Sequence, residues 1–165
     1  LLLPGAQIWA DLWVPRGDPL WSDEARASAV VAGEWWARAF GTSTGMTVHT
    51  GPSVPAPGSD LVCFAGVGPG EVSWRGRKVV GLAQWRSREG ALVHGCAYRR
   101  WDPGPLVELL SLDGDRRRSL GESLGTSAIG FDELEIAGAG ASGSLDPDAL
   151  LSALPPGPPW DVHRA

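Results

Sequence analysis

The residue of this chain whose type most clearly suggests chemistry is its single lysine, Lys78. The other thirteen of the fourteen basic residues are arginines. A position that keeps lysine is therefore a candidate for a role that needs a compact ammonium with three rotatable donors instead of a planar guanidinium. A composition biased toward arginine, with one lysine left by chance, explains the same observation, and residue usage alone leaves both interpretations open.

Lys78 stands near the start of a predicted strand that belongs to an antiparallel meander. Tight turns are predicted at Arg75-Gly76 and at Arg88-Glu89-Gly90, between apolar alternating segments. The predicted extended segments are 61–64, 71–74, 77–85 and 91–98. Because side chains alternate along a strand, we expect Lys78, Val80, Leu82 and Gln84 to share one face.

Small residues follow the lysine on two neighbouring predicted strands. They are Gly81, Ala83, Gly95 and Ala97. Together they predict a patch of sheet without bulk, where a ligand or another backbone can come close. Beside one amine such a patch suggests a slot for a ligand, and the alternative is that small residues relieve crowding beneath a helix.

Cys63 and His94 are the other candidates for chemistry. Cys63 lies fifteen residues before Lys78 (78 − 63), and a positive field from the lysine or nearby arginines would favour its thiolate if the fold brings them together. A lone cysteine in an apolar run is also typical of a buried small hydrophobe. His94 is a ligand-pocket candidate or a satisfied structural histidine, and we do not assign it as a base. The spacing of cysteines and histidines indicates no metal cluster and no disulfide framework, so we expect reduced thiols.

The surrounding elements predict an α+β domain. A strand is expected over 7–14, then a helix over 25–40 that is capped by Ser22-Asp23-Glu24 and stopped by Gly41. Further elements are a loop over 42–59 with a short strand at 46–49, a short helix over 105–112, partial helix over 116–134, and a helix ending at 154 that Asp146-Pro147 caps. This order favours helices packed on a mostly antiparallel or mixed sheet, and 165 residues fit a single domain.

Charge is unevenly distributed along the chain. The segment 71–100 holds seven basic and two acidic residues, hence +5 against a total of −5. Such a cluster suits an acidic protein partner or a phosphate, or is a solvated strand edge. The sequence pI of about 5.1 argues against strong nucleic-acid binding. No apolar run is long enough for a bilayer and no secretory signal is recognisable, so we expect a cytoplasmic protein without a membrane partner.

One motif resembles a known family. The stretch Gly76-Arg-Lys-Val-Val-Gly-Leu-Ala-Gln-Trp-Arg86, followed by Gly90-Ala-Leu-Val-His-Gly95, resembles the lysine motif of the biotin/lipoate protein ligase superfamily, in its lipoate branch. Upstream, Val62-Cys-Phe-Ala-Gly66 and Gly68-Pro-Gly-Glu-Val72 are similar to the segment that precedes this lysine in the family. The resemblance covers 61–103 strongly and 7–40 more weakly. It implies a class II synthetase-like catalytic domain.

The resemblance also implies a reaction. Lipoate or octanoate, carried as an acyl-adenylate made with ATP and Mg²⁺ or as a thioester, is moved to one lysine of a lipoyl domain. The acceptors are the E2 subunits of 2-oxoacid dehydrogenases or the glycine cleavage H protein. Lys78 matches the lysine that contacts the acyl carbonyl, where a fixed ammonium stabilises the developing oxyanion and its loss costs about 3 kcal/mol. The residues implied in substrate binding are Gly76, Arg77, Gly81, Ala83, Gln84, His94 and Gly95.

Two departures from the family keep alternatives open. The Arg-Arg-x-Gly-Gly-Gly segment that cradles the acyl chain is absent, and the start at Leu1 leads us to expect an N-terminally truncated fragment. A C-terminal accessory domain is also missing, which favours a transferase or a split ligase. The first hypothesis is a lipoate-protein ligase; the alternatives are an octanoyltransferase in which Cys63 is the nucleophile, and a non-catalytic scaffold that binds lipoyl domains through the arginine cluster.

Overall fold

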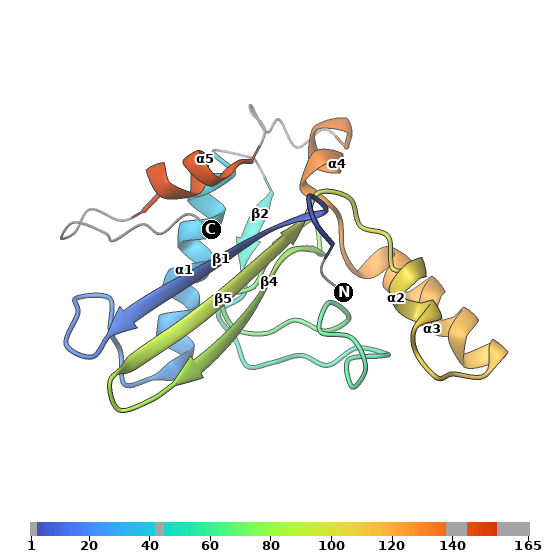
Figure 1. Ribbon diagram of the computed structural model, residues 1–165, viewed down its shortest axis with the longest axis horizontal. Helices are drawn as coiled ribbons and strands as arrows, with labels where there is room; N and C mark the ends of the chain where they lie inside the picture. Colours follow the sequence, from blue (N-terminus) through green and yellow to red (C-terminus); the bar gives the residue numbers. More distant parts are fainter. Residues whose placement is uncertain (1–2, 42–44, 138–144, 155–165) are drawn as a thin grey trace.

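The computed structural model describes residues 3–41, 45–137 and 145–154 and has an α+β architecture (Figure 1). Five strands form one sheet in the order β1-β5-β4-β3-β2, and all four pairings are antiparallel. The strands are β1 Gln7–Pro15, β2 Met46–Val48, β3 Val72–Trp74, β4 Arg77–Arg86 and β5 Gly90–Tyr98. The helices are α1 Ala25–Ala39, α2 Gly104–Glu108, α3 Gly114–Ser127, α4 Phe131–Ile136 and α5 Pro147–Ser152. The predicted α+β class is confirmed.

The hairpin that carries the lysine is set by a two-residue turn. Arg75 and Gly76 have φ of 48° and 79°, and positive φ at both central positions matches the right-handed twist of the flanking strands. The β3–β4–β5 meander is therefore as predicted. The predicted extended segment at 61–64 is wrong: Val62 N–H donates to the Gly58 carbonyl and Ala65 N–H to the Val62 carbonyl, so local turn bonds replace a strand ladder there.

The main core lies between the sheet and α1, which crosses behind the strands in Figure 1. Trp36 of α1 is fully buried and its indole lies against Gly95 of β5. The neighbouring Trp35 donates its indole N–H to the Leu150 carbonyl at 2.7 Å, which ties α5 to α1. Both tryptophans are core residues, and each fully buried aliphatic side chain packed with them contributes about 1.5–3 kcal/mol.

A close backbone contact places the start of β3. The Gly70 carbonyl lies so near Gly33 of α1 that a Cβ at residue 33 would overlap it. Gly70 has a φ of 79° and donates its N–H to the His49 carbonyl at 2.7 Å. Two glycines thus let the loop before β3 rest directly on the helix, and this contact fixes the next residue, Glu71.

A second, smaller core covers the start of β4. Its buried members are Val62, Phe64, Ala65, Val107, Leu120, Leu124 and Ala128. Directly after α3 in the sequence, the chain runs alongside β4, where Ile129 N–H donates to the Lys78 carbonyl at 2.9 Å. Figure 1 shows α2 and α3 together at this end of the sheet. Lys78, the second residue of β4, is therefore covered by the residues of this second core.

Helix ends match the predictions in part. α1 starts at Ala25 with Glu24 as its N-cap and has no side-chain cap, because the Ser22 hydroxyl accepts from Glu24 N–H instead; the predicted cap is wrong. Gly41, with φ of 75°, follows the helix as predicted. The Asp146 carboxylate caps α5 by accepting from Ala149 N–H at 2.8 Å, which confirms that prediction. The tail from residue 155, for which the sequence predicts no regular element, lies outside the described residues.

Candidate active site

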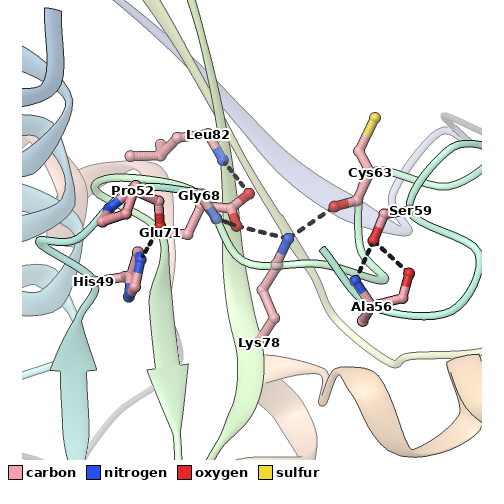
Figure 2. Close-up of polar contacts among 9 residues, drawn as sticks. All are labelled: His49, Pro52, Ala56, Ser59, Cys63, Gly68, Glu71, Lys78 and Leu82. Atoms are coloured by element: carbon pink, nitrogen blue, oxygen red, sulfur yellow. Dashed lines mark hydrogen bonds and ion pairs between the residues drawn. The ribbon is translucent and has the colours of Figure 1, made fainter. Parts of the chain in front are cut away.

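Lys78 is the most completely buried charged residue of the described chain, with 1% of its surface exposed. Its Nζ lies 2.7 Å from Glu71 Oε2 and donates to the Cys63 carbonyl at 2.8 Å (Figure 2). An ammonium has three donors. Within the described ranges the third N–H has no hydrogen-bond acceptor, and the ring centroid of Phe64 lies 5.2 Å from Nζ. The site thus combines a fixed cation with one unused donor.

Glu71 is the residue of the candidate site that the sequence patterns did not indicate. Its carboxylate accepts from Gly68 N–H at 2.6 Å and from Leu82 N–H at 3.3 Å, in addition to the lysine. A buried cation needs a counter-charge, and Glu71 stands on the other arm of the predicted hairpin. This pairing across the turn was the signal that could have found it.

Burial and the ion pair act on the ammonium in opposite directions. Desolvation lowers the pKa of Lys78, and the Glu71 carboxylate raises it, with desolvation the larger effect. A net lowered pKa means that the amine gives up its proton more readily than an exposed lysine does. Glu71 is what keeps the charged form inside the protein.

A bulge changes the face of the sheet from which Lys78 acts. Val72 pairs with Val80 and the adjacent Ser73 pairs with Lys78, so Val79 is an extra residue on β4. Regular alternation would put Lys78 and Gly81 on opposite faces, yet the ring of Phe64 lies beside both of them. Val80, Leu82 and Gln84 share a face as predicted, but Lys78 does not join them because the bulge interrupts the alternation.

The predicted patch of four small residues is also wrong. Directly paired residues share a face, and the register pairs Gly81 with Cys96 but Gly95 with Leu82. Gly95 and Ala97 therefore face α1, while Gly81 and Ala83 face the other side. Neither glycine leaves an empty slot: Trp36 lies on Gly95, and a Cβ at residue 81 would be 2.7 Å from Phe64 Cε2.

Cys63 takes part in the site through its backbone. Its carbonyl oxygen points to Lys78, whereas Figure 2 shows the sulfur directed away from the ammonium. Cys63 is exposed and Cys96 is buried, and both are free thiols. Burial raises the pKa of Cys96 to about 11, so this thiol is the less reactive of the two.

The other candidates are spread over the hairpin. Gly76 occupies the left-handed turn position, and the guanidinium of Arg77 donates twice to the Ala128 carbonyl, at 3.0 and 2.8 Å. Nε2 of Gln84 is buried without a hydrogen-bond partner among the described residues. Ala83 is exposed and pairs with His94, whose Nδ1 lies 2.7 Å from Asp11 Oδ1. The fold brings Lys78, Gly81 and the Cys63 carbonyl together, but not Gly95 or Gln84.

At least three of the six arginines of 71–100 have partners within the fold. Arg77 binds the Ala128 carbonyl, and Arg86 stacks on the ring of Trp21 with its guanidinium carbon 4.3 Å from the centroid. Arg99 pairs with Asp132 at 3.2 Å. These side chains fill separate structural positions, which weakens the interpretation of the charge cluster as a docking patch.

Comparison of the chain with protein-family models, with curated proteins and with solved structures gave no match. Within 3–41, 45–137 and 145–154, no group of three or more His, Cys, Asp or Glu side chains is arranged to hold a metal ion. In the same ranges none of the helices has the length and apolarity needed to cross a membrane.

Proposed function

We propose that this protein is an acyltransferase domain of the lipoate-protein ligase type, which attaches lipoate or octanoate to a lysine of a lipoyl domain. The observation that carries the proposal is the buried Lys78 ammonium with one N–H unused, at the start of the motif 76–95. The acyl carbonyl oxygen accepts that third N–H. In a site without water, such a donor stabilises the oxyanion of the transition state far more than it stabilises the ground state.

Glu71 and the Cys63 carbonyl support this role because they hold the ammonium in place before substrate arrives. A donor that is already oriented costs no reorganisation during the reaction. The carboxylate also keeps the amine protonated against the desolvation that lowers its pKa. An uncharged amine would lose most of this stabilisation.

The acyl chain enters along Gly81 in this proposal, and Phe64 must make room for it. The ring now rests on Gly81 and stacks on Trp101 with centroids 5.1 Å apart. Its segment is held by turn bonds, not by a strand ladder, so a displacement of the ring breaks no sheet pairing. Substrate binding is therefore coupled to movement of the segment that also carries the Cys63 carbonyl.

The test is transfer of an octanoyl group from synthetic octanoyl-adenylate to purified H protein or an E2 lipoyl domain, followed by intact-protein mass spectrometry. Lys78→Met should lower the transfer rate by about 10²–10³-fold. Arg88→Met, at an exposed position in the β4–β5 turn, is the matched control and should change the rate less than twofold. Equal rates for the wild type and Lys78→Met, with both proteins folded by circular dichroism, would refute the proposal.

A Cys63 octanoyltransferase is kept as the second enzyme candidate, favoured by the exposure of this thiol near the lysine site. It requires the sulfur to rotate from the direction shown in Figure 2. The distinguishing observation is an acyl-enzyme that neutral hydroxylamine releases and that Cys63→Ala abolishes. A ligase transfers from the adenylate without this intermediate.

The closed state of the site favours one non-enzyme candidate. The ring of Phe64 packs against Gly81, and the Lys78 ammonium is already paired with Glu71. A closed site of this kind also suits a scaffold that binds lipoyl domains and transfers nothing. Such a scaffold binds the lipoyl domain equally well with and without Lys78, as measured by titration calorimetry. It yields no acylated product from octanoyl-adenylate above the uncatalysed rate.

A further inference from the structure

The sheet face opposite α1 carries a second chemical group, an Asp–His pair. Asp11 of β1 and His94 of β5 are direct cross-strand partners. The carboxylate Oδ1 lies 2.7 Å from imidazole Nδ1. A carboxylate can only accept, so the hydrogen of the neutral imidazole is on Nδ1 and the lone pair is on Nε2. Nε2 has no hydrogen-bond partner in the described part of the chain.

The aspartate itself is held in place by a third residue. The indole N–H of Trp9 donates to Asp11 Oδ1 at 2.7 Å. The ring of Trp9 lies 5.7 Å from that of His94, centroid to centroid, with the planes tilted by 44°. Carboxylate, imidazole and indole thus fix one another, and this arrangement selects one tautomer and one orientation of the histidine.

The surroundings of the pair are apolar and accessible. The alternation and the register put Trp9, Trp13 and Trp85 on the same face as His94. These tryptophans are 47%, 41% and 58% exposed. Ala83 of β4 lies directly opposite His94 and is exposed, so the side chain paired with the imidazole on this side is only a methyl group.

The pair lies close to the lysine site. Ala83, opposite His94, follows Gly81 by two residues on the same face of β4, a rise of about 7 Å along the strand. Gly81 carries the ring of Phe64, and this ring also lies beside the Lys78 ammonium. The cation and the imidazole therefore approach neighbouring positions of one sheet face.

We infer that His94 is the general base of the acyl transfer and that Asp11 is its positioning residue; this inference rests on the proposed function. The acceptor lysine enters as an ammonium and gives one proton to Nε2, and the neutral amine nitrogen then forms a bond to the acyl carbon. As the bond from that carbon to the phosphate oxygen breaks, adenylate leaves with the electron pair. The nitrogen loses its second proton to the leaving phosphate, and the imidazolium beside Asp11 later releases the first proton to water.

A base is needed because the acceptor amine is almost fully protonated at neutral pH, its ordinary pKa being about 10.4. General base catalysis of this kind contributes about 10²–10⁴-fold. Among the described residues, the strand pairings put the following groups beside His94: Asp11 and Trp9 from β1, Ala83 from β4, and Leu92 and Cys96 on its own strand. Asp11 is the only acidic residue among them.

The experiment compares two acceptors with synthetic octanoyl-adenylate as the donor. One acceptor is the lipoyl-domain lysine, which must lose a proton before it attacks, and the other is hydroxylamine, which is already unprotonated at pH 7.5. His94→Gln should lower transfer to the lysine by at least about 100-fold and change hydroxamate formation less than threefold. The control is His49→Gln, since His49 directly follows β2, the edge strand farthest from β1, and its Nε2 lies 2.8 Å from the Pro52 carbonyl oxygen; it should affect neither acceptor.

The pH profile separates a base from a merely structural residue. With His94→Gln the rate of transfer to lysine should rise about tenfold per pH unit up to the pKa of the acceptor, about 10.4, whereas the wild type should level off earlier. Asp11→Asn removes the acceptor that selects the tautomer, so it should lower transfer to lysine at pH 7.5 by about 10-fold or more. It should leave hydroxamate formation within threefold of the wild type.

Three results would overturn the inference. Transfer to lysine that survives His94→Gln, or an equal loss with both acceptors, removes His94 from the role of base while the proposed function stands. A wild type that acylates neither acceptor refutes the proposed function, and the inference with it. The two failures are distinguishable because hydroxamate formation reports the acyl site without the base.

Discussion

The carboxylate of Glu71 and the ammonium of Lys78 face each other across a two-residue hairpin turn, with Oε2 and Nζ 2.7 Å apart. Both side chains are buried, and the carboxylate accepts two backbone N–H groups besides the lysine. The pair is therefore a feature of the hairpin itself, set by the left-handed turn at Arg75-Gly76 and by the close contact of the preceding loop with α1. Whatever binds at this site meets a cation that is already paired.

The first prediction concerns the mutual dependence of this pair. Glu71→Gln leaves a buried ammonium without counter-charge and should lower the free energy of unfolding by about 3–5 kcal/mol. Lys78→Met leaves the carboxylate with its two N–H donors and should cost less. The double variant should be more stable than Glu71→Gln alone. Urea unfolding of the four proteins gives the coupling energy, and additive effects within 0.5 kcal/mol would contradict a direct interaction.

The second prediction is a pH dependence of stability. Because burial lowers the pKa of Lys78 in the folded state, the unfolded chain binds more protons between the folded pKa and about 10.4. The cost of the buried charge is present below this window and is lost as pH rises through it. The free energy of unfolding of the wild type should thus rise relative to Lys78→Met, with a slope of up to about 1.4 kcal/mol per pH unit.

The comparison with Lys78→Met is needed because two other groups act in the opposite direction in the same range. Burial raises the pKa of Cys96 to about 11 and also raises the pKa of Tyr98. In the unfolded chain both groups lose their protons at a lower pH than in the folded protein, so their ionisation lowers the free energy of unfolding as pH rises. Both groups are present in the wild type and in the variant, so the difference isolates the lysine. If the difference in free energy of unfolding between the wild type and Lys78→Met stayed constant from pH 8 to pH 10.5, this would contradict a lowered lysine pKa.

Much of the fold followed from local rules. Alternating apolar residues located β1, β4 and β5, and Gly41 and Asp146 located helix ends. These signals are short-range, since side-chain alternation and capping depend on residues within one turn or strand. The segment 61–64 failed because a short apolar run is compatible with a strand and with turns, and its packing against α3 decided between them.

The site was only partly predictable, and the reason is register. The sequence placed Lys78 on a strand, but not the bulge at Val79 that changes its face. It also placed Gly81 and Gly95 on adjacent strands without showing that one lies under Phe64 and the other under Trp36. Asp11 and His94 lie in distant parts of the chain and meet only because β1 pairs with β5. Neither residue type indicates that pairing in the sequence.

The third prediction is a difference in thiol reactivity. At pH 8, Cys63 of the folded protein should react with an aromatic disulfide reagent as an accessible thiol, because it is exposed. Cys96 should react more than 100-fold more slowly, since its pKa of about 11 leaves little thiolate and burial blocks access. Absorbance of the released thiolate should show one fast equivalent in native protein and two in urea. The Cys63→Ser variant should lose the fast phase.

The fourth prediction tests whether two close contacts hold the core together. A Cβ at Gly95 would overlap the indole of Trp36, and one at Gly33 would overlap the Gly70 carbonyl. Either substitution by alanine should lower the free energy of unfolding by about 1–3 kcal/mol, the usual cost of overpacking. Gly33→Ala is the sharper case, because alanine ordinarily stabilises a helix interior and the backbone carbonyl cannot rotate away as a side chain can.

Gly121 is the matched control for these substitutions. It lies within α3, and nothing stands within 4 Å of where its Cβ would be. Gly121→Ala should therefore raise the free energy of unfolding by about 0.5–1 kcal/mol, through helix propensity and the smaller entropy of the unfolded chain. Opposite signs for residues 33 and 121 in urea melts would establish the contact between α1 and the loop that positions Glu71. The same sign for both would show that this loop does not rest on the helix, and the lysine would then lack the support on which its orientation depends.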